Sequence, residues 1–498
     1  MDSILKKTIK ILKSPLFILS LILVLALLLR LREINETSYW FDEAFTAVTV
    51  RSSWKDMFGI IKQDGVHPPV YYIILKIWSS IFGYSQAGIR SFSLITGLAT
   101  VVVAFLLGKL YDVKYPIKGL VSAFIIAISP FFVTYSLEAR SYSFVAMLAV
   151  FLTYFVIKFL TNNYKLKYLI PAFLIALLMF FTHYVQVVFI VAIIIASLFY
   201  SFVYTKKGVN KNLLYLFIGT IILSLILQAV LPVKEFVESK NIMNDVWWIP
   251  QLKLSDAIRF HYSYFFGVTR YISSVPPMRE MSIPISQYLI AGVLSFIHVL
   301  CYILILLSKK FTVELKRKLT FIFTLWSICY FGYLYMSLIG LEVMVERYTI
   351  ACGVILLISF FLMTTTLLGK KFFYIPIILY ILIILQLKPM AESIENREMI
   401  NEITKYRVNN EDLFYKDPWT FVIGSAYLGL DNTYYIHWDG EGTQNWAIQR
   451  KNPHLGKNLE DMKSGDILII TEYSEEMYPV SEYTLLSVNK YFSLLQKK

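Results

Sequence analysis

The sequence predicts an α-helical polytopic membrane protein with a small α/β domain at its C-terminal end. Of the 498 residues, 57% are hydrophobic and only 16% are charged, and the mean hydropathy is +0.60. A soluble protein has about a quarter charged residues. The apolar residues form long runs up to about residue 388, beyond which Asp, Asn, Gly and Trp become frequent. The two parts of the chain therefore indicate different folds.

Eleven apolar runs are long enough to cross a bilayer, which takes roughly 20 residues in a helix. They lie at about residues 14–31, 89–110, 117–137, 141–160, 167–183, 184–205, 212–233, 286–308, 318–340, 348–368 and 371–388. The stretch from Tyr168 to Thr205 has no Lys, Arg, Asp or Glu over 38 residues. Because this is too long for one span, we expect a break into two helices near His183.

Lysines and arginines indicate the orientation, because short cytoplasmic connections carry an excess of them. The N-terminus and every second connection are basic, at about residues 109–118, 158–167, 206–211, 309–318 and 370–371. We therefore expect a cytoplasmic N-terminus and, after eleven spans, an extracytoplasmic C-terminus. The composition, rich in Lys and Ile, is typical of a low-GC prokaryote and favours the plasma membrane. The net charge of +13 reflects this topology, and no nucleic-acid signature is present.

The segment HPPVYYIILKIWSSIFG, residues 67–83, is apolar enough to be a further span. Counting it would reverse all later turns and place the lysine clusters outside. A helix along the outer membrane surface fits better, because Pro68 and Pro69 suit a helix start and Lys76 can extend to the headgroups. We thus expect a membrane domain over residues 1–388, with long outer loops at 32–88 and 234–285.

The C-terminal region, residues 389–498, predicts an extracytoplasmic α/β domain with a modest core. The pieces DLFY and DILIIT are typical of strands, and PMAESIENREMINEITKY is typical of a helix. The three cysteines, at positions 301, 329 and 352, all lie in apolar runs and indicate buried small residues.

Ionisable residues gather at the outer ends of the predicted spans. Asp42 and Glu43 follow the first span almost directly, in the aromatic stretch SYWFDEAFT. Later outer segments contribute His67, Glu138, Arg140, His183, Glu346 and Arg347. Such groups are costly near a bilayer and are usually retained for a pathway or a site. Carboxylates suit proton abstraction from a hydroxyl, and arginines suit a phosphate. This mixture is what glycosyl transfer from a lipid-phosphate sugar requires.

Five motifs follow one another in a distinctive order. They are the acidic pair in WFDEAF, HPPVYY at 67–72, RSFSLITG at 90–97, the turn with Glu138, Ala139, Arg140 and Tyr142, and the pair Arg347-Tyr348. Their order and topological side resemble the GT-C glycosyltransferases of the family 39 type, which include protein O-mannosyltransferases and aminoarabinose transferases. The resemblance covers residues 38–142 well and the later spans loosely.

The resemblance implies a GT-C fold and an inverting transfer from a polyprenyl-phosphate sugar to a glycan, lipid or protein acceptor on the extracytoplasmic side. It implies Asp42 as the catalytic base, with Glu43 supporting it or contacting the acceptor. The implied donor-site residues are His67, Arg140 and Arg347 for the lipid phosphate, Glu138 for orienting Arg140, and His183 and Tyr348. The family needs no metal as a rule. A divalent metal stays open, although the spacings match no compact ligand motif.

Structural roles are the alternative for each residue. The acidic pair could favour a helix N-terminus, and His67 could cap the following helix. Glu138 and Arg140 could form an ion pair, His183 could break two spans, and Arg347 could contact lipid headgroups. For the whole chain, the alternatives are a transporter or lipid flippase, or a non-catalytic envelope protein of the same fold.

Overall fold

The computed structural model describes residues 13–32, 34–35, 37–64, 67–112, 114–204, 254–267, 285–341, 343–386, 395–436, 448, 451–471, 474, 477–488 and 492–498. It forms two compact units. The helical unit comprises Met1–Glu33, Arg90–Tyr271 and Glu280–Met390, and the α/β unit comprises Ile34–Ile89, Ile272–Arg279 and Ala391–Lys498. The α/β unit joins the first outer loop to the C-terminal domain, two segments that the sequence analysis places in different domains.

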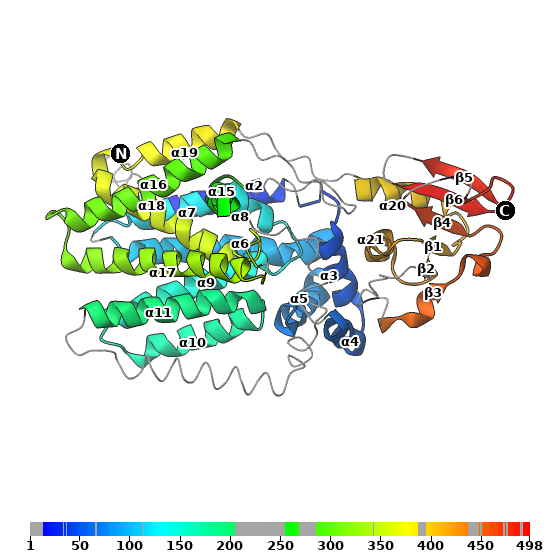
Figure 1. Cartoon of the computed structure of the whole chain (residues 1–498), viewed down its shortest axis with the longest axis horizontal. Helices are drawn as coiled ribbons and strands as arrows, with labels where there is room; N and C mark the ends of the chain where they lie inside the picture. Colours follow the sequence, from blue (N-terminus) through cyan, green and yellow to red (C-terminus); the bar gives the residue numbers. More distant parts are fainter. Residues whose placement is uncertain are drawn as a thin grey trace, which may run out of the picture. The chain divides into compact units, whose positions relative to one another are not determined.

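The helical unit is built from helices (Figure 1). They are α2 (Pro15–Leu31), α6 (Gln86–Lys109, which begins in the α/β unit), α7 (Ile117–Ile128), α8 (Pro130–Tyr135), α9 (Tyr142–Thr161), α10 (Leu166–Phe180), the 3₁₀ turn η1 (Tyr184–Gln186), α11 (Val187–Tyr204), α15 (Leu254–Phe266), α16 (Ile285–Leu307), α17 (Val313–Leu338), α18 (Ile350–Phe372) and α19 (Ile375–Gln386). Helix α18 lies at the centre, because 94% of its apolar stretch is buried, against 22% for α16.

The predicted polytopic helical fold is confirmed. Within the described ranges, six helices are long and apolar enough to cross a membrane. Four shorter apolar helices, α2, α7, α10 and α19, lie at further predicted spans. The predicted span at 212–233 lies outside the described residues, so the total of eleven stays a prediction.

Two details of the spans can be checked directly. The predicted break near His183 is confirmed, because α10 ends at Phe180 and η1 begins at Tyr184. The single helix predicted over 117–137 is wrong: α7 ends at Ile128 and α8 begins at Pro130. Proline has no backbone N–H to continue the helix, and its ring clashes with the preceding turn.

The α/β unit carries a six-stranded sheet in the order β3-β2-β1-β4-β6-β5. Its strands are β1 (Leu413–Tyr415), β2 (Thr433–Ile436), β3 (Gly456–Lys457), β4 (Ile467–Ile470), β5 (Tyr483–Val488) and β6 (Ser493–Lys497). Strands β1 to β4 pair in parallel, whereas β6 pairs antiparallel with both β4 and β5. Leu413 of β1 lies between Thr433 and Ile467 of its two neighbours.

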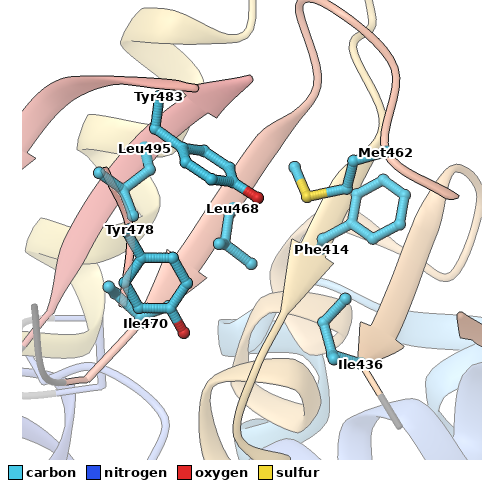
Figure 2. Close-up of a cluster of buried hydrophobic side chains, with 8 residues drawn as sticks. All are labelled: Phe414, Ile436, Met462, Leu468, Ile470, Tyr478, Tyr483 and Leu495. Carbon is cyan, nitrogen blue, oxygen red and sulfur yellow. The ribbon is translucent and has the colours of Figure 1, made fainter. Parts of the chain in front are cut away.

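The sheet has its own hydrophobic core, as Figure 2 shows. The core consists of Phe414, Ile436, Met462, Leu468, Ile470, Tyr478, Tyr483 and Leu495. Every residue of β1 and β4 is buried, which is typical of parallel strands covered on both faces. The predicted strands DLFY and DILIIT are confirmed as β1 and β4. The helix predicted at 389–406 is confirmed as α20 (Glu395–Tyr406), and its first residues, 389–394, lie outside the described residues.

In the described part of the α/β unit, five helices accompany the sheet. They are α3 (Phe41–Arg51), α4 (Trp54–Asp64), α5 (Pro69–Phe82), α20 and α21 (Pro418–Leu428), with short 3₁₀ turns η2 (Pro453–Leu455) and η3 (Leu459–Asp461). Helix α5 has 14 residues, so it is about 21 Å long and shorter than the roughly 30 Å of a bilayer core. Helices α7 and α19, which lie at predicted spans, are shorter still, so the expected position of α5 along the outer membrane surface stays a prediction.

Lys76 of α5 does not extend outward, contrary to the expectation from the sequence. Its side chain is buried, and its ammonium donates hydrogen bonds to the carbonyl oxygens of Val50, at 2.9 Å, and Ser52. Burial lowers the pKa of Lys76. These carbonyls end helix α3, where unpaired carbonyl groups attract a positive charge. Lys76 thus caps the helix that carries the acidic pair.

Candidate functional site

The predicted site residues fall into two groups, one in each compact unit. Asp42, Glu43 and His67 belong to the α/β unit. The helical unit holds Glu138, Arg140, His183, Arg347 and Tyr348. Each group is described within its own unit, and the expectation that both groups serve one glycosyl-transfer reaction stays a prediction.

Asp42 and Glu43 occupy the first turn of α3. The positive end of the helix dipole lies at the N-terminus, so the negative charges of these carboxylates are stabilised there. Their exposure differs: Glu43 is 1% exposed, whereas Asp42 is half-buried. Thr46 Oγ1 donates to the Asp42 carbonyl at 2.9 Å. Asp42 is therefore the carboxylate of the pair with the more accessible side chain.

His67 lies between α4 and α5 and is held by Asp64. Its Nδ1 and its backbone N–H approach Asp64 Oδ2 at 2.8 and 3.0 Å. The ring packs edge-on against Tyr72, with centroids 6.4 Å apart, and Tyr72 packs in the same way on Phe45 of α3. A carboxylate at Nδ1 fixes the orientation of an imidazole. Helix α5 has Pro68 at its N-cap, so capping does not explain His67.

The turn that carries Glu138 and Arg140 is fully buried between α8 and α9. Glu138 is 4% exposed and Arg140 is 3% exposed. The Arg140 N–H donates to the Glu138 carbonyl at 2.7 Å, and the Arg140 carbonyl accepts from Ser93 Oγ at 3.3 Å. Ser143 Oγ donates to the Ser93 carbonyl at 2.8 Å. Helix α6 therefore fixes the backbone of this turn.

A row of rings connects the two arginine-bearing turns of the helical unit. The ring centroids of Tyr142 and His183 are 6.1 Å apart, and those of His183 and Tyr348 are 5.2 Å apart. The guanidinium of Arg140 lies 5.8 Å from the Tyr142 ring, and that of Arg347 lies 5.5 Å from the Tyr348 ring. Both distances are typical of cation–π contacts. Residues far apart in the sequence thus form one cationic and aromatic cluster.

Gln186 holds the Tyr348 end of this row. Its Nε2 donates to the Tyr348 carbonyl at 2.7 Å, and its Oε1 accepts from the Tyr333 hydroxyl at 3.3 Å. The break between α10 and α11 therefore has a further role besides separating two helices. It presents His183 and Gln186 to the turn of Arg347 and Tyr348.

The sequence analysis missed two buried arginines. Arg259 of α15 pairs with Glu346, at 3.8 Å between Nη2 and Oε1, and Ser263 donates to the same oxygen at 3.4 Å. Glu346 precedes Arg347 directly, so this pair anchors the turn. Arg259 lies in the segment 234–285, which is predicted to be a long outer loop. No sequence motif in that segment marked Arg259 as a candidate site residue.

Arg30, at the end of α2, is 0% exposed. Its Nη1 donates to the carbonyls of Ala26 and Ala127, at 3.0 and 3.1 Å. Ala127 lies where α7 breaks before Pro130, so Arg30 satisfies a carbonyl near that break. Gly97 packs beside it: a Cβ there would be 3.3 Å from Arg30 Nε and 2.8 Å from Ser136 Cβ. The glycine of RSFSLITG therefore permits close packing against the segment leading to Glu138.

The described residues contain no group of three or more His, Cys, Asp or Glu side chains placed to hold a metal ion. The three cysteines are buried and free, as the sequence predicts.

The comparisons with known proteins bear on both fold and family. Residues 66–231 match the family described as dolichyl-phosphate-mannose-protein mannosyltransferase. This match includes His67, Glu138, Arg140 and His183 of the predicted site. No curated protein sequence matches the chain.

Two solved structures are similar in fold. ArnT from Cupriavidus metallidurans bound to undecaprenyl phosphate aligns with a TM-score of 0.51 and 8% identity, over 97% of this chain and 98% of ArnT. The apo oligosaccharyltransferase of Archaeoglobus fulgidus aligns with a TM-score of 0.51 and 12% identity, over 92% of this chain and 69% of that one. The family match over residues 66–231 agrees with the motifs, and the solved structures show that the chain has the fold of the GT-C glycosyltransferases.

Proposed function

We propose that the protein is an inverting membrane glycosyltransferase that moves a sugar from a polyprenyl-phosphate donor to an acceptor on the extracytoplasmic side. The observation that carries this proposal is the cluster in which Arg140 and Arg347 lie at the two ends of one aromatic row. A protein with the same fold, ArnT, has been solved with undecaprenyl phosphate bound. Two guanidinium groups beside aromatic rings suit a phosphate that carries an apolar tail.

In the proposed reaction, Asp42 accepts the proton of an acceptor hydroxyl while the hydroxyl oxygen attacks the anomeric carbon. The bond between that carbon and the phosphate oxygen breaks, and the electron pair leaves with the polyprenyl phosphate. Attack from the face opposite the phosphate inverts the anomeric configuration. Arg140 and Arg347 stabilise the negative charge that develops on the phosphate. This mechanism requires that Asp42 and the two arginines act on the same pair of donor and acceptor molecules.

The differing exposure of the acidic pair supports the assignment of roles. A base must contact the acceptor, and Asp42 keeps more accessible surface than Glu43. Glu43 then supports Asp42 from a buried position. His67, oriented by Asp64, is proposed to contact the donor, and Glu138 to orient Arg140.

The test is transfer of radiolabelled sugar by the full-length protein in membranes supplied with polyprenyl-phosphate glucose, mannose or galactose. Asp42→Asn removes the base and keeps the side-chain shape, so we expect about a 10²- to 10⁴-fold loss of transfer. The matched control is Glu482→Gln, an exposed acid directly before β5 that pairs with Lys497, which should retain full transfer. Full activity of Asp42→Asn would exclude Asp42 as the base, and a wild type that consumes no donor would exclude the proposed function.

We also propose that the N-terminus is cytoplasmic, that the C-terminal domain lies outside the plasma membrane, and that transfer needs no divalent metal. Reporter fusions after Lys109 and after Arg140 should report the cytoplasmic and the outer side, respectively. Transfer should persist in EDTA. A loss of transfer that added Mg²⁺ or Zn²⁺ restores would instead establish a metal requirement.

A further inference from the structure

The helix that carries the acidic pair packs along a helix of the C-terminal domain. Helix α3 lies against α21, which follows the central strand β1. Phe41, next to Asp42, contacts Trp419, with ring centroids 4.1 Å apart. Tyr39 contacts Tyr427, with ring centroids 5.2 Å apart. The side chains just before the acidic pair are therefore held by α21.

The C-terminal domain also holds the backbone just before α3. The Tyr39 N–H donates to the Tyr427 hydroxyl at 2.7 Å, and the Tyr39 carbonyl accepts from Asn396 Nδ2 at 2.8 Å. The Tyr427 hydroxyl in turn donates to Gln86 Oε1 at 3.3 Å. Trp40, the N-cap residue, makes no capping hydrogen bond with its side chain. Both peptide groups of Tyr39, three residues before Asp42, are thus bonded by helices α20 and α21.

The other end of α3 is held as well. Arg51 donates hydrogen bonds to the carbonyls of Ala426 and Tyr84, the latter at 2.7 Å. Lys451 of the C-terminal domain pairs with Asp56 of α4 at 3.3 Å, and its side chain lies against Gly59. Contacts to the C-terminal domain therefore run from residue 39 to residue 59, on both sides of the acidic pair.

We propose that the C-terminal domain positions the acidic pair, and that Asn396, Trp419 and Tyr427 are positioning residues for Asp42. This inference rests on the proposed function, since it takes Asp42 as the base. A catalytic group must be held in its productive geometry, and a misplacement of about 1 Å can cost about 100-fold in rate. The domain fixes both the side chains and the backbone that set where α3 begins.

The first test compares Trp419→Ala with Trp419→Phe in the full-length protein, using the radiolabelled polyprenyl-phosphate sugars. Trp419→Ala should lower kcat about 10- to 100-fold with little change in KM for the donor, because the arginines proposed to bind the donor phosphate, Arg140 and Arg347, lie in the helical unit. Trp419→Phe keeps an aromatic ring against Phe41 and should restore most of kcat. The control is Leu495→Ala, which weakens the sheet core of the same domain without changing a contact to α3.

Two outcomes would overturn the proposal. In the first, Trp419→Ala keeps the wild-type kcat. In the second, Trp419→Ala loses no more kcat than Leu495→Ala, measured below the unfolding temperature of both, and Trp419→Phe gives no recovery. If Asp42→Asn is inactive while Trp419→Ala is normal, this inference fails and the proposed function stands.

The second test does not depend on catalysis. Hydrogen–deuterium exchange of the segment 38–46 should be faster in Tyr427→Leu than in the wild type, because Tyr427 holds the N–H and the ring of Tyr39. Exchange in the helical unit should not change. Unchanged exchange at 38–46 would show that α21 does not order this turn, even if the wild type transferred no sugar.

Discussion

The two groups of predicted site residues are held by different physical means. In the helical unit, Arg140 and Arg347 lie in turns between apolar helices, against a row of aromatic rings. In the α/β unit, Asp42 and Glu43 begin a helix whose ends are fixed by hydrogen bonds to a domain far away in the sequence. The cations are thus part of the membrane-spanning framework, whereas the acids depend on the C-terminal domain. If the proposed roles hold, variants of the arginines should impair donor binding and variants of the acids should impair proton transfer, each without the other.

The largest expected difference is between the two carboxylates. Asp42→Asn should lower transfer by about 10²- to 10⁴-fold. Glu43→Gln should cost less, because its buried side chain is proposed to support Asp42. The initial rate of transfer from the radiolabelled donor measures both. A greater loss in Glu43→Gln than in Asp42→Asn would reverse the assignment of the base.

The arginines should affect binding of the donor phosphate. Arg140→Lys keeps the charge and removes the planar fork, and Arg140→Met removes both. We expect Arg140→Met to weaken binding of undecaprenyl phosphate about 10- to 100-fold, with Arg140→Lys in between. Equilibrium binding of labelled undecaprenyl phosphate measures this.

A matched control for that experiment is Arg317→Met. The guanidinium of Arg317 also lies over a tyrosine ring, 5.1 Å from that of Tyr204. Arg317 is near the N-terminal end of α17, whereas Arg347 follows the C-terminal end of that helix. The loss of Arg317 should leave binding unchanged. Equal weakening by Arg140→Met and Arg317→Met would indicate a general effect on the helical unit.

The smallest expected effect concerns Gly97 of α6. Gly97→Ala should lower stability by about 1 to 3 kcal/mol, since the new Cβ meets Ser136 and Arg30. Gly292→Ala in α16 is the control, because its Cβ would find only Ile258 Cδ1, at 3.7 Å. That change should be neutral or stabilise by up to about 1 kcal/mol. Thermal unfolding in detergent compares the two, and equal behaviour would contradict the close packing at Gly97.

Local sequence patterns predicted much of the helical unit and two central strands of the α/β unit. The break near His183 follows from the length of an uncharged run, and β1 and β4 follow from short apolar segments. The break at Pro130 was missed, although proline is a local signal, because hydropathy alone continued the span. Arg30 was missed because a charge at the end of a span usually indicates a headgroup anchor, whereas here it is fully buried.

The attachment of α3 to the C-terminal domain could not be predicted in this way. Tyr39 bonds to Asn396 and Tyr427, which are 357 and 388 residues away. Only the folded chain brings these segments together. The row from Tyr142 through His183 to Tyr348 also depends on the folded chain. The sequence analysis named these three residues separately but did not predict that their rings are in contact.

The most direct test of the account measures undecaprenyl phosphate binding and sugar transfer in the same preparation of Asp42→Asn. The account predicts that this variant binds the lipid phosphate as the wild type does and loses transfer about 10²- to 10⁴-fold. A variant that transfers sugar at the wild-type rate, or that loses transfer only because it no longer binds the lipid phosphate, would contradict it.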